Sequence, residues 1–260
     1  MNLAEPQPVV PMRKRRWYRY GLRTLLVVVL VVIPCSWLAV AIHEAREAAL
    51  ACGCQSHLNQ LQLVLVNYKF AHGHFPPAYI ADKDGKPMHS WRVLILPFME
   101  EGALYKEYDF NEPWNGPHNS KLADKMPSIF CMPSEPPSTS VTNIVAITGS
   151  GTAFPGSRTT RTAEFTDGLD NTILLAEIAD SNINWLEPRD LQVEEMSFAV
   201  NDKQKPSISS SRHRGPYVVF ADSIRTHQVT PSLRPEALRA LTTIAGGEKM
   251  YVSELSLIHI

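Results

Sequence analysis

The sequence predicts an α+β fold in which a long N-terminal helix crosses a membrane and continues into a domain with an antiparallel sheet packed on the helix. Three features of the 260-residue chain support this class. Nineteen residues near the N-terminus carry no charge, the next segment has apolar residues at helical spacing, and the remainder alternates short apolar runs with turn sequences. With 44% hydrophobic and 20% charged residues, the chain has the composition of a folded protein.

The uncharged run, residues 24–42, is predicted to be a retained transmembrane helix. Nineteen residues rise about 28 Å as a helix, which nearly matches the roughly 30 Å of a hydrocarbon core. Cleavage by a signal peptidase after Ala41 and lipid attachment at Cys35 are the alternatives. The run is longer than the about 7–15 apolar residues of a signal peptide, and Ile33 and Pro34 stand where a lipoprotein needs small residues. The sequence therefore favours the anchor.

Basic residues gather before this span. Residues 1–23 carry six of them: Arg13, Lys14, Arg15, Arg16, Arg19 and Arg23. The one acid there is Glu5, whereas the residues after 42 have a net charge of −6. Because Lys and Arg flank membrane spans on the cytoplasmic side, we expect residues 1–23 to be a cytoplasmic tail, residues 24–42 to cross the inner membrane and residues 43–260 to be periplasmic. A basic tail on an acidic body does not suggest nucleic-acid binding, so the expected partner is the lipid membrane.

A second helical segment follows the span directly, at residues 43–72. It contains no proline, and its apolar residues recur at spacings of three and four: Leu50, Cys54, Leu58, Leu61, Leu65 and Tyr68. Gly73 supplies a helix stop, and the two prolines after it prevent the helix from resuming. The span and this segment are expected to form one helix of about 48 residues whose apolar face packs on the sheet.

Beyond residue 78 the pattern changes to short runs typical of strands. Five segments are predicted as strands: 91–98, 143–149, 171–178, 197–200 and 216–224. The sequences "DKDG" at 82–85 and "TDGLDN" at 166–171 are typical of turns. A short helix is expected at 234–243, because Pro235 stands near its start and two glycines follow its end.

Several long motifs carry a resemblance to a known family. They are "AREAALACGCQSHLNQLQLVLVNYKFAHGHFPP" (45–77), "SWRVLILPFMEEGALYKEYDFNEPWNGPHN" (90–119), "IFCMPSE" (129–135) and "TDGLDNTILLAE" (166–177). In this order they resemble the planctomycete family called domain of unknown function 1559, whose members are pilin-like or pseudopilin-like proteins of the prepilin type. The resemblance runs from residue 45 to about residue 248.

Two departures from that family pattern concern the ends of the domain. Prepilin-type members have a Gly-Phe-Thr-Leu-x-Glu cleavage site before the helix, whereas this chain has "YGLRTLLVV" at 20–28, so its anchor is non-standard. The C-terminal signature places nine residues between a His and Asp-Gly, whereas eight separate His213 from Asp222 here, and Ser223 replaces the glycine. The resemblance implies a membrane-anchored structural or interaction protein with no enzyme activity, whose partners are related pilin-like subunits or other envelope proteins.

The "TDGLDN" segment allows two interpretations. Asp167, Asp170 and Asn171, with Glu164 nearby, are hard oxygen donors at short spacing, which is compatible with a calcium site. The simpler interpretation is a turn in which Gly168 has a positive φ and the polar side chains bond nearby amides. The turn is favoured, because the longer ligand series of an EF-hand is missing. No other cofactor is expected.

Two of the four cysteines match cysteine positions of the family. These are Cys54 and Cys131, and the resemblance implies a disulfide between them, which an exported location permits. Two buried free thiols are the alternative. Cys35 lies in the predicted span, and Cys52 is too close to Cys54 for the usual zinc spacing.

The remaining polar candidates give little support for catalysis. His72 and His74 could bind a metal, but they lie beside the helix stop, where solvent-exposed loop residues are the simpler interpretation. His213 and Asp222 could form an acid–base pair near Asp167, yet no nucleophile motif accompanies them. We therefore predict no catalytic residue. A membrane-anchored extracytoplasmic hydrolase or ligand-binding protein is the alternative function.

Overall fold

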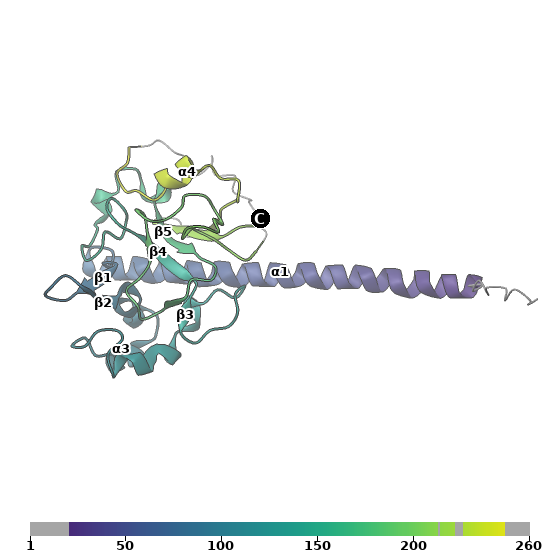
Figure 1. Ribbon diagram of the computed structural model, residues 1–260, viewed down its shortest axis with the longest axis horizontal. Helices are drawn as coiled ribbons and strands as arrows, with labels where there is room; N and C mark the ends of the chain where they lie inside the picture. The colour runs from purple at the N-terminus through teal and green to yellow at the C-terminus, as the bar shows by residue number, and fades with distance from the viewer. Residues whose placement is uncertain (1–20, 213, 222–225, 248–260) are drawn as a thin grey trace, which may run out of the picture. The chain divides into compact units, whose positions relative to one another are not determined.

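The computed structural model describes residues 21–212, 214–221 and 226–247. The chain divides into two compact units, Met1–Glu47 and Ala48–Ile260. The first helix, α1, runs from Leu22 to His72 and contributes to both units (Figure 1). This confirms the long helix expected from the sequence. Gly73 ends it with a φ of 79°, a conformation that glycine adopts at little cost.

In the first unit, α1 is apolar and exposed. Among the described residues it is the one helix that is long and apolar enough to cross a membrane. Pro34 lies inside it, and the Ser36 hydroxyl donates a 2.7 Å hydrogen bond to the Ile33 carbonyl. Length and composition therefore agree with a single-pass anchor.

The second unit is built around a five-stranded sheet with the order β7-β4-β5-β8-β9. The bounds are β4 Ile144–Thr148, β5 Ile173–Glu177, β7 Leu191–Gln192, β8 Tyr217–Phe220 and β9 Thr226–Gln228. Neighbouring strands are antiparallel except for β4 and β7, which are parallel. The class is α+β as predicted, but the sheet is mixed rather than wholly antiparallel.

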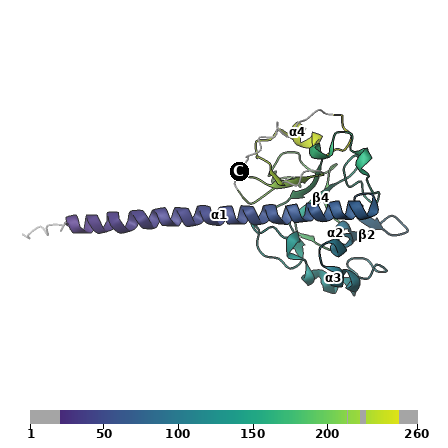
Figure 2. The same cartoon turned by 180° about the vertical axis from the view of Figure 1, so that it is seen from behind.

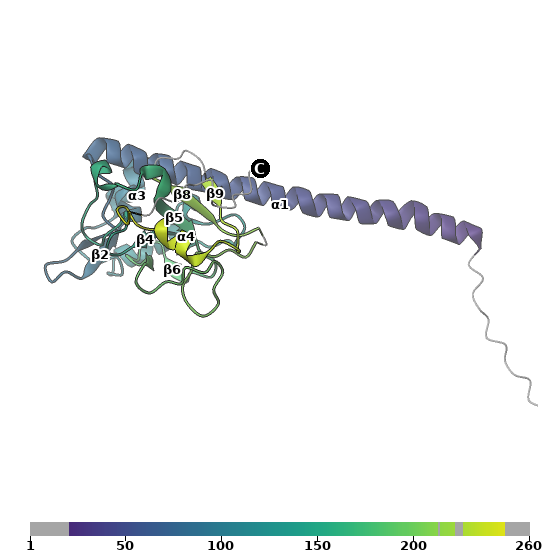
Figure 3. The same cartoon turned by 90° about the horizontal axis from the view of Figure 1, so that it is seen from above.

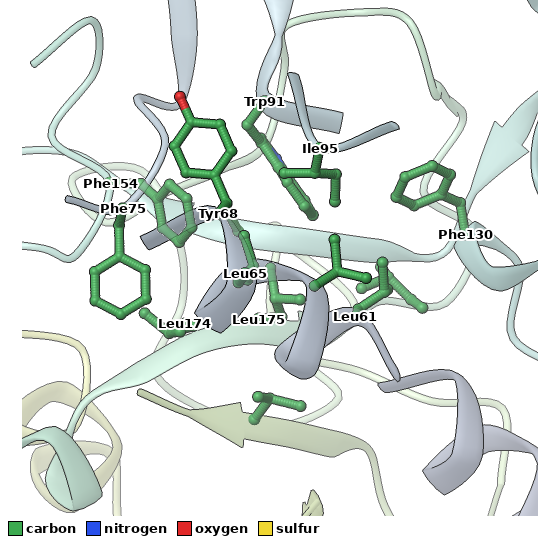
Figure 4. Close-up of a cluster of buried hydrophobic side chains, with 14 of the residues drawn as sticks. Leu61, Leu65, Tyr68, Phe75, Trp91, Ile95, Phe130, Phe154, Leu174 and Leu175 are labelled. Carbon is green, nitrogen blue, oxygen red and sulfur yellow. The ribbon is translucent and has the colours of Figure 1, made fainter. Parts of the chain in front are cut away.

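The sheet is buried on both faces. One face packs with the inner side of α1, and the core there includes Leu61, Leu65 and Leu175 (Figure 4). Val219 of β8 belongs to the same core. The other face packs with α4, Pro235–Ala240 (Figure 3). Val218 is one of the residues that this face contributes to the second core. The predicted packing of Leu58, Leu61, Leu65 and Tyr68 against the sheet is confirmed, since at most 8% of each residue is exposed.

Shorter elements fill the space around this sheet. β1 (Tyr79–Ala81) and β2 (Pro87–Ser90) form a hairpin around the predicted 82–85 turn, and β3 (Val141–Thr142) pairs with β6 (Ile183–Asn184). The short helices are α2 Trp91–Leu94, η1 Leu96–Phe98, α3 Gly102–Glu107, η2 Asn119–Lys125, η3 Ser128–Phe130, η4 Thr162–Glu164 and η5 Leu169–Asn171. The strands β4, β5 and β8 and the helix α4 confirm four predicted segments.

Two predicted strands are wrong. Residues 91–98 are helical, because the Ser90 hydroxyl accepts the Arg92 N–H at 3.3 Å as an N-cap and Pro97 stands at the start of η1. Residues 197–200 form no strand, and Ser197 makes one isolated bridge with Ser207. Residues 222–224 of the last predicted strand lie outside the described residues.

Candidate interaction surface

The outer face of α1 is exposed along the folded domain. In Figure 2 the helix lies on the near side of the domain, in front of β4. We define the outer stripe by its exposed residues: Cys52, Ser56, Gln60, Leu63, Asn67 and Phe70. Leu63 is 60% exposed and Phe70 is 92% exposed, although both are large apolar residues. Large apolar side chains exposed on one helix face are a feature of surfaces used in interactions.

Hydrogen bonds to the sheet fix the rotation of the helix about its own axis. The Gln62 side-chain amide donates to the Phe220 carbonyl at 3.0 Å. The side-chain oxygen Oδ1 of Asn59 accepts bonds from the backbone N–H of Thr226 at 3.0 Å and from its hydroxyl at 2.6 Å. The outer stripe is therefore held away from the core by specific bonds as well as by burial of the opposite face.

A groove of about 470 Å³ lies beside the stripe. The helix contributes Gln60, Leu63, Val64 and Asn67 to its wall, and two loops contribute residues 98–101 and 127–129. Apolar side chains from the helix and both loops line it, and Glu100 and Glu101 also belong to the lining. Glu100 has a φ of 65°, so the loop there adopts a backbone conformation that is costly for a residue with a side chain.

With this geometry in place, comparison with known proteins gives one match. A family model described as "Protein of unknown function (DUF1559)" matches residues 43–160. Residues 43–160 of this chain are therefore similar to that family. No curated protein and no solved structure that was compared matches the chain. The resemblance of residues beyond 160, the planctomycete source and the pilin-like character remain predictions.

The segment matched by the DUF1559 model contains both cysteines of the predicted disulfide. Both are free thiols in this structure. Cys54 is fully buried, and its thiol is 3.4 Å from the Ser134 hydroxyl. His57, one turn along the helix, donates a 2.9 Å bond from Nδ1 to the Cys131 carbonyl. The fold thus brings the two segments together, and the disulfide remains a prediction.

Burial also governs the chemistry of the Cys54 thiol. It raises the pKa of that thiol, and the hydrogen bond with Ser134 opposes the rise. A raised pKa leaves less of the reactive thiolate at neutral pH.

The proposed calcium residues lie in a turn beyond the matched segment. Gly168 has a φ of 98°, and the Asn171 side chain donates to the Asp167 carbonyl at 2.9 Å. The Asp167 carboxylate accepts the backbone N–H groups of Gly246 at 2.5 Å and Gly247 at 3.0 Å. Both its oxygens therefore help to hold residues 246 and 247. Asp170 is exposed, and calcium binding at this loop remains the untested alternative to the favoured turn.

The histidine candidates have local partners. His72 Nδ1 bonds the Tyr68 carbonyl at 3.0 Å, and His74 Nδ1 bonds the Phe75 carbonyl at 2.9 Å. Within the described residues, no group of three His, Cys, Asp or Glu side chains could hold a metal ion. His213 and Asp222 lie outside the described residues.

A buried ion pair that links the matched segment to Asp190, beyond it, was not predicted. Arg92 Nη2 lies 2.6 Å from Asp190 Oδ1, and their side chains are 0% and 2% exposed. Asp190 also accepts bonds from the Trp91 indole N–H at 3.2 Å and from the Ala146 backbone N–H at 2.8 Å. Burial raises the pKa of the Asp190 carboxyl, and Arg92 opposes the rise. This pair joins α2 to β4 and the segment before β7.

A second buried pair lies at the end of β5. The Glu177 carboxylate is 2.6 Å from Arg212 Nη2 and accepts the Ser210 hydroxyl at 2.7 Å and the Tyr217 N–H at 2.9 Å. The Arg212 guanidinium stacks over the Tyr217 ring at 4.2 Å. Burial raises the pKa of Glu177, and Arg212 opposes this. Because the carboxylate is fully buried and already bonded, the pair has the features of a structural link.

Proposed function

We propose that this chain, whose residues 43–160 match the DUF1559 model, is a membrane-anchored, pilin-like structural or interaction protein of the cell envelope. It docks related subunits or other envelope proteins through the outer stripe of α1. One observation carries the proposal: Leu63 and Phe70 are exposed on a helix face that specific bonds hold outward. The adjoining groove offers further apolar surface for a partner.

The proposed location is the inner membrane of a planctomycete, with the tail in the cytoplasm and the domain in the periplasm. The candidate span and the basic residues before it support this orientation. N-terminal sequencing of the membrane-extracted protein should find residues before Thr24 still attached. A mature chain that begins at Ile42 would instead mean a cleaved signal peptide.

The role proposed here is non-enzymatic. Its support is that the two buried acids, Glu177 and Asp190, are already bonded to arginines and backbone amides. The deepest cysteine has a raised pKa because of its burial. Neither arrangement presents an accessible general base or nucleophile.

Site-directed photocrosslinking in native membranes tests the docking surface. A photoreactive phenylalanine analogue at Phe70 should form adducts with envelope proteins or with related subunits. The same analogue at Lys106, an exposed position on α3, is the matched control and should form few adducts. Equal labelling from the two positions, or no adduct from Phe70, would count against a docking role for this face.

A further inference from the structure

We propose that the outer stripe of α1 binds the same stripe of a second copy of this chain, with the two helices parallel. This inference rests on the proposed function, because it names the partner that the docking surface takes. The spacing of the stripe, its lack of charge and its connection to the candidate span support the proposal.

The spacing of the stripe is that of a two-helix seam. From Ser56 onward its residues follow intervals of four, three, four and three. This is the alternation of a and d positions in a heptad repeat. Leu63 and Phe70 then occupy d positions, where apolar side chains insert between residues of a facing helix. Gln60 and Asn67 occupy a positions.

The stripe is complementary to itself. In a symmetric parallel pair each residue meets its own copy, so any formal charge would face a like charge. The stripe contains no acidic or basic side chain. Gln60 and Asn67 carry side-chain amides, which have both donors and an acceptor and can therefore bond to their copies. A polar residue at an a position also fixes register and the number of strands.

The chain itself sets the orientation. The candidate span precedes the stripe within the same helix, so two copies anchored in one membrane enter their domains in the same direction. A shared membrane also raises the effective concentration of the second copy. The stripe covers only about two heptads, fewer than the three or four of a sustained coiled coil. Pairing is therefore expected between anchored chains.

The domain leaves room for this pairing. Each stripe residue from Ser56 to Phe70 stands two positions after a buried residue of the inner face, which places it about 200° around the helix axis. A second helix on the outer side therefore approaches opposite to the core. The groove beside Gln60 and Leu63 provides space for side chains of the second copy.

Disulfide trapping of the full-length chain in its membrane tests the pairing. Cys35 and Cys52 are first replaced by Ser, and Leu63→Cys is added. Mild oxidation should give a dimer of twice the 29.1 kDa chain mass, and Phe70→Cys should do the same. Lys106→Cys in the same background is the control and should stay monomeric. Adding Phe70→Asp to Leu63→Cys should abolish most of the dimer, because two carboxylates would then face each other.

The outcomes separate the two proposals. If Leu63→Cys and Phe70→Cys stay monomeric while the photoreactive group at Phe70 captures a different envelope protein, the pairing is wrong and the docking function stands. If Leu63→Cys and Lys106→Cys give equal dimer, the cross-links report random collision and the pairing is also wrong. If neither cysteine cross-linking nor photocrosslinking gives a product, both proposals fail.

Discussion

The two faces of α1 within the folded domain have the same spacing and opposite environments. The inner row is Cys54, Leu58, Leu61, Leu65 and Tyr68, and the outer row is Ser56, Gln60, Leu63, Asn67 and Phe70. Every inner residue is at most 8% exposed, whereas Leu63 and Phe70 are 60% and 92% exposed. Spacing alone therefore identifies a row of residues on one side of the helix. The residue types in that row indicate whether the row is buried in the core or exposed. A wholly apolar row packs in the core, and a mixed row is compatible with both water and a partner.

The largest expected difference between the faces comes from a buried charge. Leu61→Asp should prevent the domain from folding, because an unpaired carboxylate would enter a fully buried site. The milder Leu61→Ala should lower the free energy of unfolding by about 2–5 kcal/mol. Leu63→Asp is the matched control and should change it by about 0.5 kcal/mol or less. Circular dichroism shows whether each variant folds, and urea unfolding gives its free energy of unfolding. A Leu61→Asp chain with wild-type stability would show that Leu61 is not buried against the sheet.

Buried and exposed ion pairs should also differ in how much their loss lowers the stability of the domain. Arg92→Met should cost about 3–5 kcal/mol, because Asp190 would be left buried without its cation. Lys125→Met removes an exposed pair, with Glu107, whose side chains are 52% and 42% accessible, and should cost about 1 kcal/mol or less. Urea unfolding of both variants provides the comparison. Equal losses would mean that Asp190 finds another partner or water.

Two asparagines two turns apart on α1 sharpen the comparison further. Asn59→Ala should destabilise the domain by about 1–3 kcal/mol, since the Thr226 N–H loses its acceptor and the Thr226 hydroxyl keeps only its 3.3 Å bond to the Gln55 carbonyl. Asn67→Ala should leave stability unchanged or slightly raised, because Asn67 is exposed and alanine favours helix. Thermal unfolding of the two variants measures the difference. A larger loss at Asn67 would reverse the assignment of the faces.

The smallest expected effect depends on pH and concerns His89. Burial lowers its pKa below the ordinary value of about 6.5. The unfolded chain then binds the proton first, so stability is full above pH of about 6.5 and declines as the pH falls through the lowered folded pKa. His89→Gln should remove this part of the decline, whereas His118→Gln, at an exposed histidine, should keep it. Urea unfolding at pH values from about 7 to about 5 measures the two profiles, and identical profiles would show that His89 does not contribute.

The sequence predicts most of the elements that form the core. The inner face of α1, the strands β4, β5 and β8, and α4 follow from periodicity, β-branched runs and the Pro and Gly residues that bound them. These signals are local in sequence, and each of these elements is long or apolar enough for its residue pattern to identify it as a helix or a strand. The outer stripe can also be read from the spacing once the inner face is known.

The errors arise where tertiary contacts override local pattern. The apolar run after Ser90 resembles a strand, but Ser90 caps a helix and Arg92 turns inward to a carboxylate 98 residues away. An arginine within an apolar run normally indicates a solvent-facing position, so the buried pair could not be inferred. The same holds for Glu177 and Arg212, which are 35 residues apart. The groove depends on how two loops approach the helix, and no local signal specifies that.

The bond between Gln62 and Phe220 has a consequence for the order in which the protein is made. The two residues are 158 positions apart, and the helix is synthesised first. At about 5–20 residues per second, the ribosome needs roughly 8–30 s to reach β8 after completing that part of α1. During this interval the inner row of the helix has no complete sheet to cover it. A chain truncated before β8 would therefore lack the β8 side chains, such as Val219, that complete the core around this row.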